Sequence, residues 1–197
     1  MGYAAALQVV NHIVFGGGVC GGVHADACDE FADYLVASEE LEPGCGWNYD
    51  AFIEKLTENT SINGAGLGKI ICDSYYEGCC DILQEDAATL SVIELSKIHE
   101  LVKAYDSAGA EALIMAGISD DSSYFNEVAR CAYSSENYGG NNDSEGYTNM
   151  VDIGDFINNN IKEDLLPASG KRVLSALDSA VIYKVNGPLR SDSCGLS

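Results

Sequence analysis

A short apolar run near the N-terminus ends in three glycines: His12-Ile13-Val14-Phe15-Gly16-Gly17-Gly18. A second apolar run, Tyr34-Leu35-Val36-Ala37, ends in the acidic loop Ser38-Glu39-Glu40. Apolar runs of four residues that stop at a turn are typical of strands buried on both faces. Since a helix is predicted after each run, we expect two neighbouring strands of an α/β sheet, with both loops at the carboxyl edge.

The rest of the chain continues to alternate between helices and strands. Runs rich in β-branched residues predict strands over 89–95 and 181–185. Apolar side chains three and four residues apart predict the helices, which we place at 22–31, 48–58, 65–80, 110–118, 122–133, 155–161 and 173–180, with another beginning after Ser96. No internal repeat is visible, so we expect a single α/β domain over residues 1–197 with a largely parallel sheet.

The composition limits the classes of function. The 197 residues include 31 Asp and Glu against 10 Lys and Arg, a net charge of −21. This charge excludes a general nucleic-acid partner and disfavours an anionic membrane surface, because both need clustered cations. It would attract a basic peptide or protein. No membrane-length apolar run and no signal peptide is visible, and the eight cysteines are expected to be reduced and mostly buried.

Two short motifs near the N-terminus could carry chemistry. Residues Gly16 to Gly21 satisfy GxGxxG, and Glu39 follows the next strand, as in a dinucleotide fingerprint; the alternative is a flexible strand-to-helix turn. Cys20, His24 and Cys28 are spaced by four and would share one face of a helix. They could supply a nucleophile and its base, or metal ligands; the alternative is buried cysteine beside a partly exposed histidine.

Two acidic loops are candidates for cation binding. The loop from Ser38 to Trp47 holds three carboxylates and the lone Trp, a composition suited to a positively charged ligand; the alternative is a solvated acidic loop. The segment 141–155 carries four carboxylates. Their spacing does not match an EF-hand, so the pattern leaves a calcium site there open but gives it no support.

Several separate motifs resemble the clostripain family of cysteine peptidases. The longest is residues 31–49, FADYLVASEELEPGCGWNY. The others are 66–75, 89–97, 138–140 and 149–156, and the final 195–197 is similar to the start of a family strand that normally continues. The resemblance covers the chain from about residue 3 to its end, and it is far more specific than the GxGxxG pattern.

The resemblance implies a caspase-like three-layer α/β/α sandwich with a mostly parallel sheet, incomplete here at both ends. It also implies an endopeptidase that cleaves after Arg or Lys with a His–Cys dyad, in which a thiolate attacks the scissile carbonyl. No cofactor follows from the residues, and calcium is suggested by the resemblance alone. A secreted or cell-surface bacterial location is likewise implied only by the resemblance.

The catalytic residues of the family do not carry over. When the run 12–15 is aligned with the family strand, Gly18 occupies the position of the family cysteine. Gly16 then occupies the position of the aspartate that binds the basic side chain of the substrate. A literal Asp-Ala-Cys ends at Cys28, but it lies too close to the strand at Tyr34 for the helix that should intervene. The catalytic histidine is expected upstream, on a segment or chain missing here. Cys28, with Cys20 and His24, is therefore the fallback, and we expect no independent turnover.

Three functions follow, in order of preference. The first is a clostripain-like peptidase domain that is inactive by itself. The second is a non-catalytic domain that recognises basic peptides through Ser38, Glu39 and Trp47, beside Gly16. The third is a dinucleotide-binding domain that uses Gly16 to Gly21.

Overall fold

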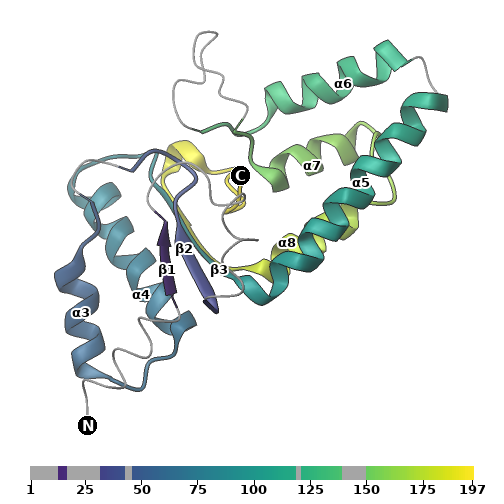
Figure 1. Ribbon diagram of the computed structural model, residues 1–197. Coiled ribbons are helices and arrows are strands. Elements are labelled where there is room, and N and C mark those ends of the chain that lie inside the picture. Colours follow the sequence, from purple (N-terminus) through teal and green to yellow (C-terminus); the bar gives the residue numbers. More distant parts are fainter. Residues whose placement is uncertain (1–12, 17–31, 43–45, 119–120, 139–149) are drawn as a thin grey trace.

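The structure is a computed structural model, and it describes residues 13–16, 32–42, 46–118, 121–138 and 150–197. Among these residues, four strands form one sheet in the order β1–β2–β3–β4 (Figure 1). The strands are β1 (Ile13–Gly16), β2 (Tyr34–Ala37), β3 (Thr89–Glu94) and β4 (Val181–Asn186). The four predicted strands are therefore confirmed to within one residue at each end.

The expectation of a mostly parallel sheet is wrong for the described strands. β1 and β2 run parallel, whereas β2–β3 and β3–β4 are antiparallel pairs. In the described part of the chain, two α-helices separate β2 from β3 and four separate β3 from β4. An even number of helical passes brings the chain back to the edge of the sheet that it left. Each following strand therefore runs in the opposite direction.

One face of the sheet packs against three helices. They are α5 (Ile98–Ile118), α7 (Ile153–Lys162) and α8 (Gly170–Ala180). Leu35 of β2 and Ile93 of β3 are buried in one cluster with Leu101, Ile157 and Leu177 of these helices. Burial of each such side chain contributes on the order of 1.5–3 kcal/mol, so this cluster is a main source of stability.

The opposite face packs against α3 (Tyr49–Glu58) and α4 (Gly64–Tyr76), which continues as the π-helix η1 (Glu77–Ile82). Val36 lies in this second cluster because successive side chains of a strand point to opposite faces. Helix α4 approaches β3 closely at Gly68, where a Cβ atom would lie 2.8 Å from Val92. Helices thus cover both faces of the sheet (Figure 1), which confirms the three-layer α/β/α arrangement.

The remaining long helix, α6 (Asp121–Ser134), packs with α5 and α7 at the far end of the helical layer (Figure 1). The helices predicted beyond residue 48 are confirmed, although 98–118 is one continuous helix after the short 3-10 turn η2 (Leu95–Lys97). The predicted helix 22–31 lies outside the described residues. Across the described ranges, no helix has the length and apolar character needed to span a membrane.

Candidate functional site

The parallel pair β1–β2 brings two sequence-predicted site positions to one edge of the sheet. Gly16, the last residue of β1, is the register partner of Ala37, the last residue of β2. Ser38 follows directly. Ligands of α/β sheets bind outside the carboxyl ends of parallel strands. We call this region the site edge: the ends of β1 and β2, the loop Ser38–Glu42 and Trp47.

The start of the loop is fixed by the first residue of β3. The Oγ1 atom of Thr89 accepts hydrogen bonds from the backbone N–H groups of Glu39 and Glu40, at 3.1 and 3.0 Å. The hydroxyl of Ser38 donates to the carbonyl of Glu40 at 2.8 Å. All three loop residues are buried. The loop backbone therefore has one defined conformation, with Ser38 facing Thr89 rather than solvent.

The carboxyl group of Glu39 points into the protein. Its Oε2 atom accepts hydrogen bonds from the hydroxyl of Ser193 at 2.5 Å and the N–H of Gly195 at 3.2 Å. Asp152 binds the same turn, since its Oδ2 atom accepts from the N–H of Cys194 at 2.6 Å. Burial, and then repulsion from Asp152, raises the pKa of Glu39 well above its ordinary value. Two carboxyl groups thus hold one turn near the C-terminus.

Arg190 neutralises the second loop carboxylate. Its guanidinium group pairs with Glu40 and with Glu136, the latter at 2.7 Å, and all three side chains are less than a tenth exposed. It also donates to the carbonyl of Asn137 at 3.2 Å. Burial raises the pKa of Glu136, and Arg190 offsets part of the rise. We call Glu39, Glu40, Glu136, Asp152 and Arg190 the acidic network.

Glu42 is the loop carboxylate that the acidic network leaves out. It is half-buried, and its buried Oε1 atom has no hydrogen-bond partner among the described residues. Burial raises the pKa of Glu42, and the neighbouring Trp47 indole N–H offsets part of the rise. Trp47 itself packs in the cluster of α3 and α4. A carboxylate oxygen in this setting is suited to a positively charged ligand.

The other predicted catalytic residues are not tested. Gly18, Cys20, His24 and Cys28 lie outside the described residues, as does most of the GxGxxG motif. The structure shows no disulfide bond at the five described cysteines, which are Cys72, Cys79, Cys80, Cys131 and Cys194. Burial, with a smaller contribution from Asp152, raises the pKa of Cys194 to about 12, and burial also raises the pKa of Cys72 and Cys131. Those three thiols are therefore poor nucleophiles at neutral pH.

Of the four carboxylates in the loop 141–155, Asp143 and Glu145 lie outside the described residues, and the two described ones hold backbone N–H groups. Asp152 caps α7 by accepting from the N–H of Asp155 at 2.7 Å, and its other oxygen binds Cys194 and Tyr138. Asp155 accepts from the N–H of Glu136 at 2.8 Å. Across the described part of the chain, no group of three or more His, Cys, Asp or Glu side chains is placed to hold a metal ion.

Sequence reasoning missed the residues that organise the acidic network. Arg190 follows Glu40 by 150 positions, and Ser193 follows Glu39 by 154. Neither lies in a periodic segment, and pairings over such distances leave no local signal. A lone Arg near the C-terminus of a chain with so few cations is the one hint that the sequence offers.

The fold is shared with solved bacterial peptidases. A clostripain from Bacteroides thetaiotaomicron, solved with a peptide inhibitor, has a TM-score of 0.60 and 19% identity, over 97% of this chain and 81% of that chain. A Bacteroides fragilis cysteine protease gives 0.59 and 18%, over 98% and 80%. An inactive zymogen of a C11 protease from Parabacteroides distasonis gives 0.57 and 16%, over 99% and 55%. At these identities the likeness establishes the fold alone.

A family comparison covers most of the chain. The profile of the clostripain family matches residues 26–193, which include the site edge beyond β1 and the whole acidic network. The comparison with curated proteins finds no match.

Proposed function

Since the chain belongs to the clostripain family, we propose that it is a peptidase-type domain that binds Arg- or Lys-containing peptides at the site edge and does not cleave them alone. The observation that carries this proposal is the parallel pairing of β1 and β2, with Gly16 opposite Ala37. That pairing supports assigning the glycine run to the position where the family carries its nucleophile. Glycine has no side chain that could attack a carbonyl group or bind the basic side chain of a substrate.

The basic side chain of the peptide would be bound by Glu42. Glu39 and Glu40 are occupied by Ser193, Gly195 and Arg190, and they support the loop from behind. Glu42 retains a carboxylate oxygen without a hydrogen-bond partner in the described structure. A buried, unpaired carboxylate oxygen gains from a charged donor more than a solvated one does. Ser38 and Glu39, together with the packed Trp47, would then shape the site rather than contact the cation.

Calorimetry with a short Arg peptide tests the binding. We expect the Arg peptide to bind and a matched peptide with Gln in place of Arg not to bind. The change Glu42→Gln should weaken binding at least about tenfold, because it removes the charge that pairs with the guanidinium group. Glu58→Gln is the matched control, since Glu58 is an exposed carboxylate on α3 whose partner is Lys55. No heat of binding with the Arg peptide would rule out the site.

A reporter assay tests the absence of cleavage. The purified chain should not release a fluorophore from an Arg or Lys reporter peptide. Cleavage that iodoacetamide abolishes would contradict the proposal, and Cys28→Ala would then show whether Cys28 is the nucleophile.

A dinucleotide-binding function ranks last, and a melting curve tests it. NAD at millimolar concentration should leave the melting temperature unchanged, because a ligand stabilises only a protein that binds it. A concentration-dependent rise would favour the GxGxxG interpretation of Gly16 to Gly21.

A further inference from the structure

A groove between α5 and α8 collects positive charge on an otherwise acidic protein. Its volume is about 500 Å³ and it opens to solvent. Three of the ten Lys and Arg residues of the chain line it, namely Lys97, Lys103 and Arg172, against one carboxylate, Glu100. The whole chain has a net charge of −21. The side chains that line this groove therefore carry a charge of opposite sign to that of the protein as a whole.

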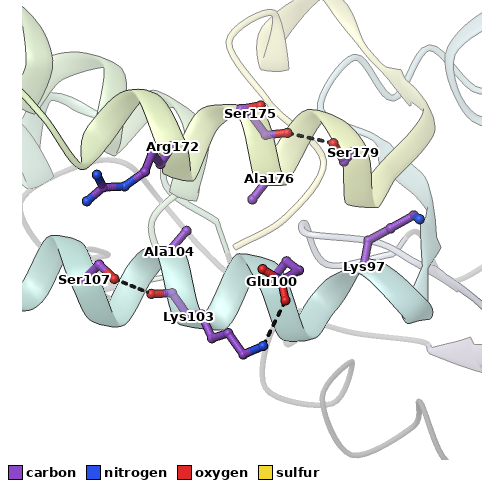
Figure 2. Close-up of a pocket in the computed structure, with 9 residues that line it drawn as sticks. All are labelled: Lys97, Glu100, Lys103, Ala104, Ser107, Arg172, Ser175, Ala176 and Ser179. Atoms are coloured by element: carbon purple, nitrogen blue, oxygen red, sulfur yellow. Dashed lines mark hydrogen bonds and ion pairs between the residues drawn. The ribbon is translucent and has the colours of Figure 1, made fainter.

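The cations are spread along the groove rather than gathered at one point. Figure 2 shows Arg172 at one end and Lys97 at the other, with Ala104 and Ala176 pointing toward each other between the helices. Ser179 follows Arg172 by seven positions of α8, which corresponds to about 10 Å of helix. An extended peptide covers that distance with roughly three or four residues. The charge distribution therefore suits an elongated ligand better than a single small anion.

The lysines of the groove are only weakly engaged. Lys103 pairs with Glu100 at 2.9 Å within one turn of α5, and Lys97 of η2 pairs with Glu94 at the end of β3 at 3.7 Å; both lysines are substantially exposed. Exposed pairs of this kind contribute little to stability, so a carboxylate of a ligand can replace the intramolecular partner. The guanidinium group of Arg172 has no hydrogen bond or close ion pair among the described residues, but its charge acts on Glu111 and helps to lower the pKa of that carboxyl group. A ligand carboxylate can pair with Arg172 without breaking a hydrogen bond, although it would approach the charge of Glu111.

We propose that this groove binds an extended acidic segment of a partner protein. The small side chains of Ala104 and Ala176 let a peptide backbone approach the helices, while cations at both ends pair with its carboxylates. No aromatic ring lines the groove for base stacking, which separates it from single-stranded nucleic-acid grooves. The proposal is independent of basic-peptide binding at the site edge, because the two sites require ligands of opposite charge.

A fluorescein-labelled peptide of alternating Asp and Glu residues tests the proposal by fluorescence anisotropy. We expect saturable binding at low salt that weakens as salt rises toward about 150 mM, where screening acts over about 8 Å. The reversals Arg172→Glu and Lys97→Glu should each weaken binding by about fivefold or more. Both side chains are exposed, so circular dichroism should report an unchanged fold, and Arg172→Gln provides a milder second variant.

Lys55→Glu is the matched control. Lys55 forms the same kind of exposed pair within α3, with Glu58 at 3.1 Å, but does not line the groove. It should bind the acidic peptide as tightly as the unmodified chain. Three results would overturn the proposal: no saturable binding at low salt, an equal loss of affinity in Lys55→Glu, or a single-stranded oligonucleotide that binds as tightly as the peptide. Binding of the Arg peptide at the site edge should be unchanged in Arg172→Glu.

Discussion

The acidic network at the site edge and the groove between α5 and α8 use charge in opposite ways. In the network, Arg190 and Glu40 are 8% and 9% exposed, and each charge has a fixed partner from a distant segment. In the groove, Lys103 and Glu100 are 64% and 72% exposed and pair within one turn of one helix (Figure 2). The contrast separates charges that build the fold from charges that remain available to a ligand.

Burial is the physical cause of this difference. Removing an ion from water costs several kcal/mol, so a buried charge is tolerated only with a close partner, and losing that partner is expensive. An exposed ion remains solvated whether or not it has a partner. The comparison therefore makes a general prediction: substitutions in the acidic network change stability, and substitutions in the groove change binding.

The largest expected effect follows from Arg190→Met. This change leaves Glu40 and Glu136 buried without their shared counter-charge. We expect the free energy of unfolding to fall by about 3–5 kcal/mol, measured by urea denaturation. Adding Glu40→Gln and Glu136→Gln to the same chain should recover part of the loss, because the uncompensated charges are then gone.

Arg130→Met is the exposed control for this experiment. Arg130 is 62% exposed and pairs with Glu127 at 2.5 Å and with Glu163 at 3.4 Å, so it has as many acidic partners as Arg190. Its loss should cost less than about 1 kcal/mol. Equal losses at the two positions would contradict the distinction between buried and exposed charge.

The second prediction concerns pH. Burial and the charge of Asp152 raise the pKa of Glu39 above its ordinary value of 4.5, so the folded chain keeps this proton to a higher pH than the unfolded chain does. The stability that the neutral form provides is complete below about pH 4.5. It is lost as the pH rises through the raised pKa of the folded state.

Glu39→Gln should reduce this pH dependence. The amide stays neutral and can still accept the hydrogen bonds from Ser193 and Gly195. Urea midpoints measured between about pH 5 and pH 9 should therefore decline less steeply in the variant. A residual decline is expected, because burial also raises the pKa of Glu136 and of Asp155. Parallel curves for the two proteins would show that Glu39 does not titrate in this range.

Glu111 is a partly buried carboxylate, intermediate between the buried charges of the acidic network and the exposed charges of the groove. Glu111 of α5 anchors the two residues that precede α8, since it accepts hydrogen bonds from the N–H groups of Ala168 and Ser169, at 3.3 and 2.8 Å, and from the hydroxyl of Ser169. We expect Glu111→Ala to cost about 1–2 kcal/mol, because hydrogen bonds to a charged acceptor are lost. Thermal denaturation of both proteins measures it.

The pH dependence of this cost provides the check. The hydrogen bond from Ser169 lowers the pKa of Glu111. The stabilisation is therefore present above the unfolded pKa and lost as the pH falls through the lowered value. The melting temperatures of Glu111→Ala and the unmodified chain should converge in acid. A constant difference down to acid pH would mean that the loss comes from packing and not from the hydrogen bonds to the charged carboxylate.

The sequence alone predicted the elements well and their connections poorly. The run Tyr34–Ala37 and the β-branched segment from Thr89 are strands as predicted, because a local pattern determines local structure. Their antiparallel pairing was missed, because strand direction depends on how many helices lie between two strands and how those helices pack. The motif over 31–49 indicated the family that the profile match then showed.

The position of the acidic loop beside the end of β1 was predicted, but its internal contacts were not. The acidic loop after β2 does lie beside the end of β1, as the strand order suggested. The burial of Glu39 and Glu40 was not foreseen, because their partners come from residues 190–195. A run of carboxylates is usually a solvated surface, and only the three-dimensional position of Arg190 shows that this one is largely interior.

The smallest expected effect on stability comes from Lys103→Ala in the groove. Lys103 is 64% exposed and its pair with Glu100 is open to solvent, so the urea midpoint should not move measurably. The same change should weaken the binding of the acidic peptide by roughly threefold, because one of the three groove cations is lost. Lys55→Ala, at the equivalent pair on α3, should change neither quantity. A clear loss of stability in Lys103→Ala would show that the groove cations are structural, as those of the acidic network are.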